Sequence, residues 1–210
     1  MLKRLILRAL AIWRTRQSRQ IPYTELQAKH LEHLKTIVNR ETLLEYLPKQ
    51  GVVAEVGVLK GDFSQLILSK CQPKQLHLID VWAGKEGLEN LEEVKKRFSA
   101  EIRNGQIILH QGLSANVLKQ FPNGCFNWIY LDTDHTYQST ATELKLSAQI
   151  LNINGLILGH DYLTGNWNGG VRYGVVEAVN EFCVQEGWEF IFLTAETHRH
   201  LSYGIKIIHQ

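Results

Sequence analysis

The chain has 210 residues, of which 44% are hydrophobic and 21% are charged, and its formal net charge is +2. These values are typical of one globular domain with a substantial core, and the small net charge does not indicate a general nucleic-acid-binding surface. The three cysteines, Cys71, Cys125 and Cys183, form no CxxC pair and have no zinc-ligand spacing. We therefore expect a protein of a reducing compartment, the cytoplasm.

The first 20 residues are basic and amphipathic. They contain six Lys or Arg residues and no acid, with apolar residues at steps of three and four, which is typical of a helix with one basic and one apolar face. Arg8 interrupts the apolar run and no clear A-x-A site follows, which disfavours a signal peptide. We favour packing of this helix on the domain or on a partner subunit of a homo-oligomer. Peripheral contact with a membrane surface is the alternative.

Residues 24–48 have apolar side chains at helical spacing and predict a further helix, which Pro48 and Gly51 end. We place an N-terminal helical extension at residues 1–45. Strands and helices alternate from there on. Strands are predicted at residues 51–57, 75–81, 106–111, 126–132, 155–159, 189–194 and 203–208. Helices are predicted at residues 62–71, 88–102, 114–121, 138–151 and 171–186.

This alternation predicts an α/β domain over residues 46–210. We expect a Rossmann-like, seven-stranded, mainly parallel sheet with helices on both faces, in addition to the N-terminal helices. The apolar runs at residues 128–131 and 156–158 fit strands that are buried on both faces. The glycine-containing loop at residues 162–172 is either a lid over a site or a plain surface connection.

The most informative stretch is VVAEVGVLKGDF at residues 52–63. An apolar run carries Glu55 near its end, passes Gly57 and Gly61, and enters a predicted helix. Glycines allow a ligand to approach the backbone closely, whereas a carboxylate repels phosphate and attracts hydroxyl, ammonium or sulfonium groups. The turn lacks the G-x-G-x-x-G dinucleotide fingerprint, and the chain has no P-loop. The stretch therefore predicts a site for an adenosine-containing cofactor that is not held by its phosphates.

Polar or glycine residues also follow the other parallel strands, where ligands of open α/β sheets bind. Asp80 follows the second strand and can accept both hydrogen bonds of a ribose diol. Gly112 and Ser114 follow the third strand, where adenine would lie. The next two strand ends carry DTDH at residues 132–135 and HD at residues 160–161. We expect these side chains to meet at one edge of the sheet.

At these residues the chain resembles the class I methyltransferases that use S-adenosylmethionine. The resemblance rests on EVGVLKG at residues 55–61, on Asp80 and on YLDTDHTY at residues 130–137. The last of these, with NGLILGHDY at residues 154–162, is most similar to a branch of small-molecule O-methyltransferases. That branch includes the macrocin-type sugar enzymes and is related to catechol and caffeoyl-CoA enzymes. The resemblance covers residues 45–210.

The resemblance implies S-adenosylmethionine as the cofactor. Glu55 and Gly57 would lie by its methionine part, Asp80 would bind the ribose, and Ser114 would lie near adenine. The full set of expected cofactor residues is Glu55, Gly57, Gly61, Asp80, Gly112, Ser114 and Asp132.

The resemblance also implies a divalent metal, because related enzymes hold Mg²⁺ after the fourth and fifth strands. The matching positions are Asp132, His160 and Asp161. Such an ion would bind a substrate diol and lower the pKa of the attacking hydroxyl. His160 departs from the pattern, since imidazole suits zinc, manganese or iron better than magnesium. A different metal, a site without His160 and a metal-free site all stay open.

His135 lies three residues after Asp132, where catechol-type relatives carry a lysine base, and histidine titrates near neutral pH. His135 and Asp132 are therefore the candidate catalytic residues. The expected reaction is methyl transfer to a hydroxyl oxygen of a small sugar or phenol-like acceptor. Either His135 or a metal would activate that hydroxyl. Asp134 is as well explained by a cap on the helix that follows.

Other residues receive plainer interpretations. Surface or structural roles are expected for His110, His198, His200 and His209, and a cleft-lining or buried position for Trp82 and Trp167. A second hypothesis is a binding or scaffold protein that kept the fold and lost turnover, with its basic N-terminus at a membrane or a partner. A nucleic-acid partner is disfavoured, because the chain has no NPPY-like base-flipping motif and no basic stripe beyond residue 20.

Overall fold

The computed structural model describes residues 21–166, 170–196 and 200–208. The predicted basic helix at residues 1–20, together with Trp167, His198 and His209, lies outside the described residues. Within the described ranges, no helix is both long enough and apolar enough to cross a membrane.

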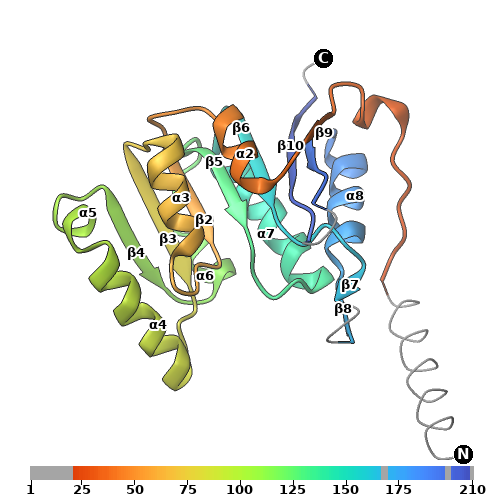
Figure 1. Ribbon diagram of the computed structural model, residues 1–210. Coiled ribbons are helices and arrows are strands. Elements are labelled where there is room, and N and C mark those ends of the chain that lie inside the picture. Colours follow the sequence, from red (N-terminus) through yellow and green to blue (C-terminus); the bar gives the residue numbers. More distant parts are fainter. Residues whose placement is uncertain (1–20, 167–169, 197–199, 209–210) are drawn as a thin grey trace, which may run out of the picture.

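An eight-stranded sheet forms the centre of the molecule, with the strand order β1-β9-β10-β6-β5-β2-β3-β4 and helices on both faces (Figure 1). Its strands are β1 (Lys35–Ile37), β2 (Val52–Val56), β3 (Gln75–Asp80), β4 (Ile107–Gln111), β5 (Phe126–Leu131), β6 (Leu151–Gly159), β9 (Trp188–Thr194) and β10 (Tyr203–Ile207). All neighbouring strands are parallel except β10, which is antiparallel to both β6 and β9. The prediction of a mainly parallel Rossmann-like sheet is confirmed, with one strand more than expected.

The helices pack in two layers, each over its own apolar core. They are α2 (Arg40–Leu43), α3 (Asp62–Cys71), α4 (Gly84–Arg97), α5 (Ser99–Arg103), α6 (Ser114–Leu118), α7 (Tyr137–Ile150) and α8 (Val175–Glu186). One core lies between the sheet and α2, α3 and α4, and the other between the sheet and α6, α7 and α8. Because side chains alternate along a strand, β5 directs Trp128 and Tyr130 into the first core and Ile129 and Leu131 into the second.

The predicted helix at residues 24–48 is wrong. This segment forms the 3₁₀ turn η1 (Ala28–His30), then β1 and α2, and the 3₁₀ turn η2 (Leu44–Tyr46). β1 adds an eighth strand, with Thr36 opposite Leu193 of β9. The β-branched side chains of Thr36 and Ile37 favour an extended chain. Asn39 then starts α2, because its side chain accepts a hydrogen bond of 2.8 Å from the backbone N–H of Thr42.

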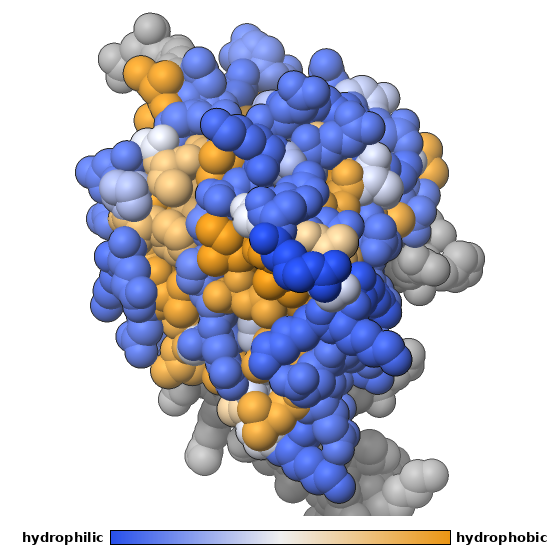
Figure 2. All heavy atoms as spheres, turned by 90° about the vertical axis from the view of Figure 1, so that its left-hand side faces the viewer, coloured by the Kyte–Doolittle hydropathy of each residue, from blue (hydrophilic) through white to orange (hydrophobic). Residues whose placement is uncertain are grey.

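Two smaller differences concern helices and a loop. The helix predicted at residues 88–102 is two helices, α4 and α5, which are separated at the buried Phe98. The loop at residues 162–172 contains a two-stranded antiparallel ribbon of β7 (Gly165–Asn166) and β8 (Val171–Arg172). Figure 2 views the molecule from the side of α4, α5 and β4, where apolar surface lies among hydrophilic side chains.

Candidate active site

A cavity of about 760 Å³ opens at the carboxyl ends of β2, β3, β4 and β5. Its volume lies in the range of small-molecule sites, about 300–1,000 Å³. The predicted residues that line it are Glu55, Gly57, Asp80, Gly112, Ser114, Asp132 and His135. Gly61 is the residue before α3, between the lining residues Lys60 and Asp62. The ends of β2, β3, β4 and β5 thus meet as the sequence predicts, whereas His160 and Asp161, which follow β6, do not line this cavity.

Gly57 is required by the close packing of β2 against β5. Its φ angle is +92°, and a Cβ atom there would lie 1.8 Å from the backbone oxygen of Asp132. The N–H of Gly57 donates to the oxygen of Ile79 at 2.8 Å, so the chain passes closely between β5 and β3. Gly61 has a φ angle of +80° and a Cβ would lie 2.6 Å from the ring of Phe98. Glycine is therefore needed here for chain packing as well as for a backbone that faces the cavity.

Asp80 fixes the loop between β2 and α3. Its Oδ2 accepts hydrogen bonds from the backbone N–H groups of Val58 at 2.7 Å and Leu59 at 2.9 Å, and its Oδ1 accepts one from Trp82 at 3.0 Å. A carboxylate offers about four lone-pair positions, so Asp80 keeps acceptor capacity toward the cavity. Trp82 itself is buried, and its Nε1 donates to the oxygen of Leu59. It does not line the cavity.

The β3–β4 end of the cavity has an apolar rim. Val81 and Leu113, which follow these strands, line the cavity with 46% and 63% of their surface exposed. Exposed apolar side chains at the rim of a cavity gain stability when a ligand covers them. The rim is suited to a flat apolar ring such as a nucleobase.

Glu143 of α7 is a buried acid in the cavity wall that the sequence analysis missed. Its carboxylate accepts hydrogen bonds from Ser114 Oγ at 2.5 Å and from Thr133 Oγ1 at 2.9 Å. Burial raises the pKa of Glu143 to about 7. A signal for it was present, because Thr140, Glu143, Leu144 and Ser147 follow one another at helical spacing on the buried face of α7.

Glu55 is the second buried acid of the cavity wall, with 2% of its surface exposed. Its Oε2 accepts a hydrogen bond from Ser64 Oγ of α3. Burial raises the pKa of Glu55 to about 8, against the hydrogen bond from Ser64, and the charge of Asp132 raises it further. Glu55 is therefore largely protonated at neutral pH.

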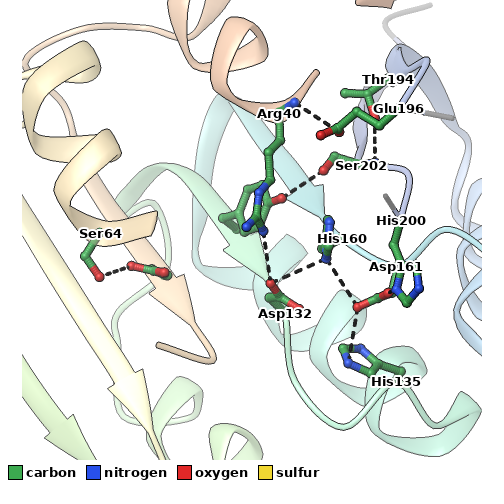
Figure 3. A network of polar contacts seen from close by, with 12 residues as sticks. Arg40, Ser64, Asp132, His135, His160, Asp161, Thr194, Glu196, His200 and Ser202 are labelled. Carbon is green, nitrogen blue, oxygen red and sulfur yellow. Dashed lines mark hydrogen bonds and ion pairs between the residues drawn. The ribbon is translucent and has the colours of Figure 1, made fainter. Parts of the chain in front are cut away.

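An acid–histidine cluster borders the cavity at the ends of β5 and β6, and Figure 3 shows its contacts. Asp161 is 3% exposed, and its Oδ2 lies 3.2 Å from both His135 Nε2 and His160 Nδ1. The other oxygen of Asp161 contacts Nδ1 of His200. Asp132 Oδ2 lies 3.6 Å from His160 Nδ1. We call these five residues, Asp132, His135, His160, Asp161 and His200, the acid–histidine cluster.

The charges within the cluster support one another. Burial lowers the pKa of His160, but its close contacts with the carboxylates of Asp132 and Asp161, and their charges, outweigh burial and raise that pKa to about 9. Burial raises the pKa of Asp161, yet His160, His135 and His200 hold it below the usual value. The arrangement is a histidine cation between two carboxylates.

Two cluster residues have unusual backbone conformations. The φ angles of His135 and Asp161 are +60° and +56°, in the left-handed region that non-glycine residues seldom adopt. His135 is held there by the N–H of Gly174, which donates to its backbone oxygen at 2.8 Å, and its ring lies 4.8 Å from that of Tyr173. Such conformations are often found where a site requires one side-chain direction.

The cluster contains a set of possible metal ligands. Ligand atoms of Asp132, His135 and Asp161 all lie within 4.8 Å of one another. The predicted set had His160 in place of His135, and His160 instead contacts both carboxylates as an ion-pair partner. Imidazole mixed with carboxylate suits zinc, manganese or iron better than magnesium, which prefers oxygen ligands.

Arg40 and His200 reach the site from distant parts of the chain, and sequence reasoning missed both. Arg40 lies in the segment predicted as a long helix, although Asn39 before it carries the signal of a helix start. His200 was interpreted as a surface or structural residue, and nothing in its local sequence indicates the contact with Asp161. Asp134 lies beside the start of α7 but is not its cap, contrary to the alternative interpretation. It accepts hydrogen bonds from Thr136 and Ser139, while Thr136 is the N-cap itself.

Comparison with known proteins finds one matching family and many solved structures with a similar fold. The family model described as "Methyltransferase domain" matches residues 54–162. A search of curated proteins finds no match.

Three similar solved structures are the SAM-dependent methyltransferase from Aquifex aeolicus, the trans-methyltransferase CalH in complex with SAH, and the pyocyanin biosynthetic protein PhzM. Their TM-scores are 0.61, 0.59 and 0.58, with identities of 11%, 12% and 12%. The alignments cover 87%, 80% and 76% of this chain, and 94%, 55% and 51% of theirs. The chain therefore spans only about half the length of CalH and PhzM.

Other similar structures include a tRNA methyltransferase, a putative rRNA methylase and a ribosomal protein methylase. At such low identities these similarities show the fold alone. They do not separate the small-molecule branch from the others.

Proposed function

This chain belongs to the methyltransferase-domain family, and we propose that it transfers a methyl group from S-adenosylmethionine to a hydroxyl oxygen of a small molecule. The observation that carries the proposal is the position of the acid–histidine cluster. Asp132 and His135 line the same cavity whose other end is formed by Asp80, Leu113 and Ser114. One cavity thus has an end that is suited to a nucleoside and an end with potential proton acceptors.

The strand order supports one direction for the cofactor. Asp80 at β3 would accept the ribose hydroxyls, and the apolar rim at Val81 and Leu113 would cover adenine. From β3, the sheet continues on the side away from β4 with β2 and then β5. The methionine part would therefore lie by Glu55 of β2 and Asp132 after β5. The sulfonium would then face the acid–histidine cluster.

In the proposed reaction the acceptor oxygen attacks the methyl carbon, the bond from that carbon to sulfur breaks, and S-adenosylhomocysteine leaves with a neutral sulfur. His135 would accept the hydroxyl proton, with Asp161 holding its ring through the 3.2 Å contact at Nε2. The protein mainly supplies orientation and a site that excludes water. A small sugar or phenol-like acceptor agrees with a cavity bordered by acids and imidazoles rather than by a basic surface.

The same residues fit a divalent ion. Asp132, His135 and Asp161 would hold it, and a bound ion would orient acceptor hydroxyls and lower their pKa. If a metal is bound, His135 is one of its ligands and not the base. Whether activity depends on a metal therefore distinguishes the two roles of His135. Activity that survives dialysis against a chelator, with a pH profile that changes in His135→Gln, would favour the base.

Calorimetry with S-adenosylhomocysteine tests the cofactor assignment. We expect binding by the wild type and its loss in Asp80→Ala, with Glu89→Ala on the exposed face of α4 as the matched control. No binding by the wild type at millimolar ligand would contradict the proposal. A panel of hydroxylated acceptors and their amine analogues, with the methyl position of each product found by NMR, then tests oxygen as the acceptor atom.

A further inference from the structure

We infer that Arg40 binds the carboxylate of the methionine part of S-adenosylmethionine, an assignment that rests on the proposed function. Arg40 is contributed by the segment before β2, outside the residues matched by the family model.

The fold holds Arg40 in place through its backbone. It is the first residue of α2, directly after the N-cap Asn39. Its N–H donates to Oε2 of Glu196 at 3.1 Å, and the neighbouring strand β1 is paired with β9. The start of α2 is therefore held at the β1–β9 end of the sheet. From there the Arg40 side chain extends toward Asp132 (Figure 3).

The guanidinium lies in the cavity wall with donors to spare. Its carbon is 4.8 Å from the ring centroid of Phe63, and its Nη1 is 3.6 Å from Asp132 Oδ2. The side chain is 26% exposed, and Arg40 lines the cavity. A guanidinium has five N–H donors, and the 3.6 Å contact with Asp132 is longer than a hydrogen bond. The group is positioned by the Phe63 ring and by the hydroxyl of the buried Tyr130, and it keeps further donors for a ligand in the cavity.

The ligand group that fits this position follows from the strand order. Asp80 and the apolar rim take the ribose and adenine, so the amino-acid end of the cofactor lies toward β5 and α2. That end carries one carboxylate and one ammonium. Arg40 and Asp132 present the two opposite charges 3.6 Å apart, which suits such a pair.

Lys60 is the other Lys or Arg residue among those that line the cavity. Its side chain is 54% exposed and its Nζ lies 4.0 Å from Glu93 of α4. Arginine also presents a planar fork that binds a carboxylate through two parallel hydrogen bonds, whereas lysine is a point charge. Arg103, an exposed arginine of α5 that does not line the cavity, is the matched control for Arg40.

The test compares two ligands by calorimetry on the full chain. One is S-adenosylhomocysteine, and the other is its decarboxylated analogue, which keeps the amine. We expect Arg40→Ala to weaken S-adenosylhomocysteine by about 10- to 100-fold, as for loss of a charge-assisted hydrogen bond, and to leave the affinity for the analogue within about twofold of the wild type. Arg103→Ala should change neither affinity, and Arg40→Lys should recover part of the loss.

Each other outcome has a defined meaning. Unchanged affinity of Arg40→Ala for S-adenosylhomocysteine would overturn the inference and leave Arg40 for an anionic acceptor. An equal loss for both ligands would also overturn it, since Arg40 would then only maintain the shape of the site, and thermal unfolding of the variant would show that change. If the wild type bound neither ligand, the proposed function itself would fail.

Discussion

Replacement of Glu55 by glutamine measures how much the buried carboxyl of the proposed cofactor site lowers the free energy of unfolding. The carboxyl of Glu55 is 2% exposed and accepts a hydrogen bond from Ser64. Burial, opposed by that hydrogen bond and assisted by the charge of Asp132, raises its pKa from 4.5 to about 8. Glutamine has nearly the same shape and can accept the same hydrogen bond from Ser64, but it does not titrate.

The sign follows from the order of the two pKa values. Below pH 4.5 the carboxyl is protonated in both folded and unfolded chains, so its full contribution to stability is present. As the pH rises, the unfolded chain releases its proton first, and stability is lost until the pH exceeds the folded pKa. At about 1.4 kcal/mol for each tenfold change in ionisation, a pKa of about 8 instead of 4.5 costs at most about 5 kcal/mol, and about 3 kcal/mol at pH 7.

We therefore expect Glu55→Gln to gain stability over the wild type as the pH rises. The difference in the free energy of unfolding should grow by about 3–4 kcal/mol between pH 5 and pH 8, as an upper limit. Urea denaturation of both proteins at each pH measures it, with Glu89→Gln on the exposed face of α4 as the control. A difference that is the same at both pH values would refute the reasoning. The variant should also bind S-adenosylhomocysteine more weakly, as for other residues that trade stability for function.

Three further predictions concern other parts of the fold. Gly57→Ala places a Cβ 1.8 Å from the backbone oxygen of Asp132, so we expect urea denaturation to show a free energy of unfolding that is lower by about 3 kcal/mol or more. Calorimetry should show no binding of S-adenosylhomocysteine, and wild-type stability and binding would contradict the packing argument. Burial and the neighbouring His110 lower the pKa of His77 to about 4, so the wild type should lose stability as the pH falls from 6.5 to 4. His77→Gln should show a flatter pH dependence in urea denaturation, and an unchanged slope would exclude His77 as its source. Thr136→Ala removes the oxygen that accepts from the N–H of Ser139 at 3.2 Å, and thermal unfolding should show a loss of about 1 kcal/mol, whereas no loss would mean that Asp134 alone supports the helix start.

The parallel core of the fold could be predicted because its signals are local. The strands β2, β3, β4 and β5 lie within one residue of their predicted bounds, and α3 begins and ends at the predicted residues 62 and 71, whereas β6 begins at Leu151, four residues before its predicted start. β1 could not be predicted in the same way. Its three residues form a strand only because β9, more than 150 positions later, pairs with Lys35, Thr36 and Ile37. Helical spacing in the surrounding residues pointed to the wrong element, since tertiary pairing overrides weak local preference.

The residues of the candidate site also differ in whether local sequence signals could place them. Glu55, Asp80, Ser114 and Asp132 each follow or end a predicted strand, and the rule for open α/β sheets was enough to bring them to one edge. Glu143 comes from the buried face of a helix that was predicted, so its position could have been derived from periodicity. The rule for strand ends contains no information on residues from other elements.

Arg40 and His200 belong to this last class, and one junction explains both. The N–H of Ala195 donates to the oxygen of Ile37 at 2.8 Å, and Glu196 accepts the N–H of Arg40. The chain that follows β9 therefore holds the start of α2 and, a few residues later, directs His200 to Asp161. Arg40 reaches Asp132 and His200 reaches Asp161, so the two carboxylates of the acid–histidine cluster are each contacted from this junction. Its geometry depends on contacts about 150 residues apart, which is why neither residue could be assigned to the site from its own neighbourhood in the sequence.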